Sequence, residues 1–177
     1  RQRQMCIRDS IQTMWAFQNQ LFGIAYRYSE ATKQSWLKEW EKMMEFCRVN
    51  HPASTFSPAF HEVVCNNAGI TYYTKEEPVE EDLKKNPNKL IFHYIEKNLT
   101  GQAQESAMAL LFLRDANEEK YDPEILTLEE RFEQLYPQSK WQPLIDETIA
   151  KNKAFNQAKM PDYIHFPNVD LSLIHIS

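Results

Sequence analysis

The chain is poor in glycine and has no long apolar run. Only three of its 177 residues are glycine, while nine are proline. Folds with many tight β-hairpins need glycine at their turns, so this composition favours helices separated by prolines. Because no run of about 20 apolar residues occurs, the sequence predicts no membrane-spanning segment. A Gly-rich phosphate loop, a nucleophile elbow and a Cys-x-x-Cys pair are also missing, so no motif names a reaction.

Cysteine is scarce, whereas aromatic residues are plentiful. The cysteines are Cys6, Cys47 and Cys65, too few to establish or exclude an oxidising compartment. Hydrophobic residues make up 42% of the chain, with four Trp, eight Tyr and ten Phe. This content is typical of a folded domain and argues against a disordered chain.

The two ends of the chain do not look like natural coding sequence. Residues 4–10 can be encoded by CAG ATG TGT ATA AGA GAC AG followed by a pyrimidine. The reverse complement of most of that DNA, CTG TCT CTT ATA CAC ATC T, encodes residues 171–176 and begins Ser177. Both ends resemble the mosaic end of transposase-based sequencing adapters. We therefore expect residues 1–10 and 171–177 to be adapter-derived, and residues 11–170 to come from a longer natural protein.

The net charge argues against a nucleic-acid partner. Without the adapter-derived residues, Lys and Arg fall from 20 to 17 and Asp and Glu from 25 to 24, so the formal charge changes from −5 to −7. An acidic domain with no local basic stripe repels phosphate backbones. The remaining length of about 160 residues is normal for one domain with its own core.

Apolar residues recur every three or four positions along most of the chain, which is typical of amphipathic helices. One continuous apolar stripe is formed by Trp36, Leu37, Trp40, Met43, Met44 and Cys47. We predict helices over residues 11–28, 29–48, 57–73, 86–101, 102–117, 122–137 and 139–155. The predicted fold class is therefore all-α, an antiparallel array or bundle of about seven helices without a solenoid repeat.

Prolines and one glycine set several predicted boundaries. Ser57-Pro58 and Asn86-Pro87 each place a capping side chain before a proline suited to the first helical turn. The helix after Ser57 carries its apolar face on to Ile70 and Tyr73, and Gly101 is expected to be a C-cap. Asp122-Pro123 repeats the start signal, and the acidic stretch 76–82 is expected to be a solvated connection.

The pattern changes after Met160-Pro161. Residues 163–170 are aromatic and β-branched, which is typical of an extended segment or a first strand. We therefore predict a helical domain over residues 11–160 and a short extended segment over 161–170 that begins a second, truncated domain.

Two cysteines and two histidines form a mirrored pair, Cys47-x-x-x-His51 and His61-x-x-x-Cys65. Residues four apart share one helix face, so two facing helices would present these four side chains to a zinc ion. The interpretation that we favour is structural. Cys47 lies on an apolar stripe as a small hydrophobe, and His51 follows a helix end, where its cationic form suits the dipole. We therefore predict no catalytic, cofactor-binding or metal-ligating residues.

An acidic group on one predicted helix offers the other candidate for chemistry. Glu129, Glu130 and Glu133 fall in the polar arc between the apolar positions Leu128, Phe132 and Leu135. A catalytic carboxylate needs burial or a close like charge to shift its pKa. We interpret these three side chains as a solvated face.

Three segments carry a resemblance to a known family. They are IFHYIEKNLTG at 91–101, FEQLYPQSKWQPLI at 132–145 and, above all, MPDYIHFPNVD at 160–170. They resemble the helical region that precedes the thioredoxin domain in bacterial TlpA-like thiol-disulfide oxidoreductases. In that family the last segment leads into the thioredoxin domain, so 161–170 would be its truncated start.

The resemblance implies a function for the parent protein and none for the chain by itself. The parent would be a periplasmic or cell-envelope disulfide reductase, acting on protein thiols through a Trp-Cys-x-x-Cys motif that this chain does not reach. The chain would be its accessory helical domain, without cofactor or reductase activity. The alternative is a helical binding or scaffold domain with no enzyme attached.

Overall fold

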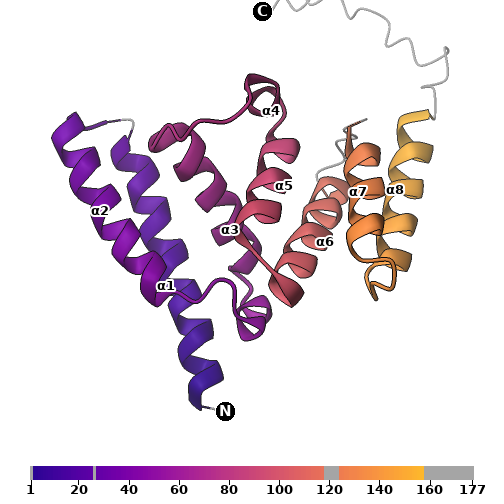
Figure 1. Cartoon of the computed structure of the whole chain (residues 1–177), viewed down its shortest axis with the longest axis horizontal. Coiled ribbons are helices and arrows are strands. Elements are labelled where there is room, and N and C mark those ends of the chain that lie inside the picture. Colours follow the sequence, from indigo (N-terminus) through magenta and orange to yellow (C-terminus); the bar gives the residue numbers. More distant parts are fainter. Residues whose placement is uncertain (1, 26, 118–123, 158–177) are drawn as a thin grey trace, which may run out of the picture.

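The computed structural model describes residues 2–25, 27–117 and 124–157, and all regular structure within these ranges is helical (Figure 1). The elements are α1 (Gln2–Ala25), α2 (Glu30–Phe46), η1 (Pro52–Phe56), α3 (Phe60–Gly69), η2 (Ile70–Thr74), α4 (Glu81–Lys85), α5 (Pro87–Asn98), α6 (Gly101–Asn117), α7 (Ile125–Leu135) and α8 (Gln142–Gln157). Here η1 is a 3-10 helix and η2 is a π-helix. The predicted all-α fold is confirmed, whereas the extended segment and domain boundary predicted at 160–170 lie outside the described residues.

The helices form an array in which some neighbours in the chain, such as α1 and α2 or α5 and α6, pack against each other, and other contacts join helices further apart in the chain (Figure 1). The first two, α1 and α2, form an antiparallel hairpin. Next to this hairpin, α3 packs against α1 and α5, and α6 packs against α5 and α8. The short helix η1 contacts both α1 and α6. Because α3 also touches α6, these two helices join the N-terminal hairpin to the pair α7 and α8.

The helix α1 begins and ends earlier than the sequence predicted, over Gln2–Ala25 instead of 11–28. Its inner face carries Ile11, Met14 and Leu21, which are fully buried at three- and seven-residue spacing. Although α1 has 24 residues, neither it nor any other helix in the described part of the chain is long and apolar enough to cross a lipid bilayer.

The two described proline start signals behave differently. At α5 the prediction is confirmed: the Asn86 side chain accepts from the Lys89 N–H at 3.0 Å, and Pro87 opens the helix. At α3 it is wrong, because the helix begins at Phe60 without a side-chain cap. Ser57 is instead the C-cap of the preceding helix η1, and its N–H donates to the Ser54 carbonyl. The third signal, at 122–123, lies outside the described residues.

Two connections also differ from the expectation. The C-cap of α5 is Leu99, not Gly101. Gly101 instead opens α6 with φ of +57°, in the left-handed region that favours glycine, and so turns the chain between the two helices. The acidic stretch 76–82 is only partly a connection, because its end folds into the short helix α4, which has no buried side chain.

The π-helix η2 buries Tyr72 but not Tyr73. The Lys75 N–H donates to the Ile70 carbonyl five residues earlier, at 2.8 Å. With this wider turn, Tyr72 enters the core at 1% exposure, and Tyr73 remains 52% exposed. The prediction that Tyr73 lies on the apolar face is wrong because it assumed a 3.6-residue period throughout.

A buried amide joins the first three long helices. Asn67 on α3 is fully buried, and its side-chain oxygen accepts from Gln18 Nε2 of α1 at 2.6 Å. The same oxygen accepts from the indole Nε1 of Trp40 on α2 at 3.3 Å. Because an indole nitrogen only donates, this contact also fixes which way the Asn67 amide points.

Replacing Asn67 tests this contact. Asn67→Ala leaves the Trp40 indole N–H without an acceptor and removes the shorter of the two hydrogen bonds of Gln18 Nε2, which keeps only the Val63 carbonyl at 3.3 Å, so we expect the free energy of unfolding to fall by about 2 kcal/mol. Urea denaturation followed by circular dichroism measures it. Asn66→Ala, one residue earlier and half-buried, is the control and should cost no more than about 0.5 kcal/mol. Equal losses in the two variants would contradict the assigned role.

The second half of the array is joined by one glutamine and a row of aromatic rings. Gln104 on α6 donates from Nε2 to the carbonyls of Leu99 at 2.6 Å and Glu96 at 3.1 Å, so it caps the end of α5. Its side-chain oxygen accepts from the Tyr136 hydroxyl, just beyond α7. Aromatic contacts run from Phe92 on α5 to Phe112, Phe132 and Tyr136, with ring centroids between 5.5 and 6.4 Å apart.

We expect Gln104→Leu to lower the free energy of unfolding by about 2 kcal/mol, because it removes the cap of α5 and the partner of Tyr136. Gln102→Leu makes the same change at an exposed position of α6 and should alter stability by about 0.5 kcal/mol or less. Chemical denaturation of both variants measures the difference. A Gln104→Leu protein as stable as the parent would rule out the cap.

Candidate functional site

The four residues of the zinc hypothesis lie at two separate places. Cys47 is the C-cap of α2, where its thiol is buried and donates to the Ser10 carbonyl at 3.7 Å. His51 caps η1, with Nδ1 accepting from the Ala53 N–H at 3.0 Å. His61 and Cys65 both lie on α3, where the imidazole Nε2 is 3.5 Å from the thiol sulfur.

The structure does not bring these four side chains together. Among the described residues, the only His, Cys, Asp and Glu side chains grouped closely enough to hold a metal ion lie elsewhere, on α7 and α8. In addition, Nη1 of Arg114 lies 3.5 Å from the Cys65 sulfur, and a guanidinium in that position disfavours a zinc ion. His61 and Cys65 therefore form a local contact within α3, which Arg114 of α6 joins through the Cys65 sulfur.

The thiols of Cys47 and Cys65 both have a raised pKa, so both are protonated and unreactive at neutral pH. Burial raises the pKa of Cys47 to about 11, against a small lowering from its hydrogen bond with Ser10. Burial raises the pKa of Cys65 to about 12, and the nearby Arg114 offsets only part of this effect. Because the thiolate is the nucleophile, neither side chain is suited to thiol-disulfide exchange at neutral pH.

The imidazole beside Cys65 is also strongly perturbed. Burial, together with the smaller effect of the positive charge of Arg114, lowers the pKa of His61 to about 4. Its Nδ1 is buried and has no hydrogen-bond partner among the described residues. His61 is therefore neutral in the folded protein at pH values where the unfolded chain already binds a proton.

This difference predicts a loss of stability in mild acid. The folded pKa of His61 is below its ordinary value of 6.5, so its contribution is complete above 6.5 and is lost as the pH falls towards 4. We expect a loss on the order of 3 kcal/mol across that range, measured by urea denaturation at a series of pH values. In His61→Gln this part of the pH dependence should disappear, and an unchanged profile would contradict the assignment.

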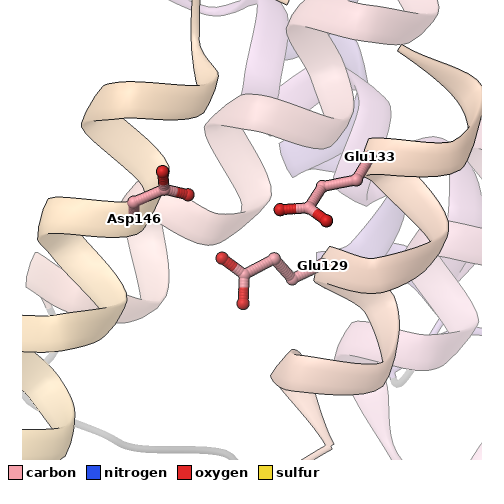
Figure 2. Close-up of side chains that lie close together, drawn as sticks. All are labelled: Glu129, Glu133 and Asp146. Carbon is pink, nitrogen blue, oxygen red and sulfur yellow. The ribbon is translucent and has the colours of Figure 1, made fainter. Parts of the chain in front are cut away.

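Three carboxylates converge between α7 and α8. Glu129 and Glu133 lie one turn apart on α7, and Asp146 faces them from the first turns of α8 (Figure 2). One oxygen atom from each lies within 4.8 Å of the other two. Glu133 and Asp146 are exposed, and Glu129 is half-buried. This is the one place in the described part of the chain with the geometry of a cation site.

A neutral amide donates hydrogen bonds to two of these three carboxylates. Gln142, at the start of α8, donates from Nε2 to Glu133 at 3.0 Å and to Asp146 at 2.8 Å. Together with Glu133, it also lines an open depression of about 530 Å³, which Glu130, Gln134 and Pro137 complete. Carboxylate oxygens are the ligands that Mg²⁺ and Ca²⁺ prefer, so the group has suitable donors. Exposed carboxylates bridged by a neutral amide are equally typical of a solvated helix seam.

The sequence identified only part of this group. Glu129, Glu130 and Glu133 were predicted to form a solvated face, and two of them, Glu130 and Glu133, are exposed. Asp146 was not singled out, because nothing local to its sequence distinguishes it. It meets α7 only because the short turn after Leu135 folds α8 back beside that helix. The spacing of four between Gln142 and Asp146 was the one available signal, since it places both on the same face of α8.

Burial raises the pKa of Glu129, and the neighbouring carboxylates of Asp146 and Glu133 raise it further, while Lys153 acts in the opposite direction. A carboxyl group with a raised folded pKa contributes stability at low pH and loses it as the pH rises through that pKa. At pH 7 the ionised Glu129 therefore opposes folding.

We accordingly expect Glu129→Gln to raise the free energy of unfolding at pH 7 by about 0.5 kcal/mol, a gain that vanishes below about pH 4. The matched control is Glu147→Gln on α8. A hydrogen bond from Lys151 lowers the pKa of Glu147, so this variant should gain nothing. Thermal denaturation at both pH values distinguishes the two. A Glu129→Gln protein no more stable than the parent at pH 7 would show that the carboxylates do not repel.

Comparison with known proteins adds no relative: no family model, no curated protein and no solved structure matches this chain.

Proposed function

We propose that the chain is the helical accessory domain of a periplasmic or cell-envelope thiol-disulfide oxidoreductase of the TlpA-like kind. In this proposal it contacts protein substrates or the catalytic domain through its surface and performs no chemistry itself. The observation that carries the proposal is the family resemblance of segments 91–101, 132–145 and 160–170. The raised pKa of both described thiols supports the second part of it.

The first two of these segments, 91–101 and 132–145, form helices and turns that contribute to the core. Residues 91–101 form most of α5 and its turn into α6, and residues 132–145 form the end of α7, the turn and the start of α8. Ile95, Phe132 and Ile145 from these segments are fully buried. The segments that carry the resemblance therefore include core and turn positions of this fold.

A role in contacting another polypeptide is supported by exposed aromatic rings. Phe46 at the end of α2 is 80% exposed, and Phe56 at the end of η1 is 71% exposed. Aromatic side chains are enriched at protein interfaces because they bury a large area at little entropic cost. This observation favours a binding domain, either within an oxidoreductase or, as the alternative function, in a scaffold protein with no enzyme attached.

The DNA that follows the codon for Asp170 in the source gene distinguishes these functions. Within about 60 codons, an accessory domain should be followed by a β-rich run and a Trp-Cys-x-x-Cys motif. Continued helical sequence or a stop codon would contradict the oxidoreductase and leave the scaffold function.

The claim that the chain performs no thiol chemistry has its own test. In a Cys6→Ser background only Cys47 and Cys65 remain, and their high pKa values should make both react slowly with an aromatic disulfide reagent at pH 7. Both should react rapidly in urea. The unaltered chain should not reduce insulin above the dithiothreitol background. Turnover that Cys47→Ser or Cys65→Ser abolishes would overturn the claim.

A further inference from the structure

We draw no further inference here: the strongest candidate, the group of Glu129, Glu133 and Asp146 between α7 and α8 with the open depression beside it, is an acidic cluster at which no second feature of the described residues points to a ligand.

Discussion

The N-terminal half of the fold depends on one buried side-chain oxygen. Asn67 accepts hydrogen bonds from α1 through Gln18 and from α2 through Trp40, so it holds the hairpin on α3 in a single register. Apolar contacts alone allow helices to slide or rotate with little change in buried area, because the hydrophobic effect has no direction. A buried acceptor with two donors opposes such a shift, because it would leave the Trp40 indole N–H without its acceptor.

The C-terminal half uses the same principle with different residues. Gln104 closes α5 by binding its last carbonyls, and it reaches the end of α7 through Tyr136. Around this contact, the rings of Phe92, Phe112 and Phe132 supply apolar area that the three helices share. Because α3 and α6 touch each other, the two polar contacts belong to one continuous core.

The chemistry of the described residues suits a domain that acts through contact. Burial protonates the thiols of Cys47 and Cys65, and it keeps the imidazole of His61 neutral. These groups are uncharged in the folded state at neutral pH and are poorly placed to react. The three carboxylates at α7 and α8 lie at the surface, where Gln142 bridges two of them.

The sequence by itself determined the helical class, most helix spans and the apolar stripe of α2, because these follow from a 3.6-residue period and from local caps such as Asn86. Tertiary structure decided the features that a 3.6-residue period does not predict, namely local departures from the α-helix and contacts between helices. The π-turn left Tyr73 exposed, Ser57 became the C-cap of η1 instead of the start of α3, and the fold of α8 onto α7 brought Asp146 to Glu129. It also separated the two halves of the zinc hypothesis. Spacing along a chain fixes which residues share a face, but only packing fixes which faces meet.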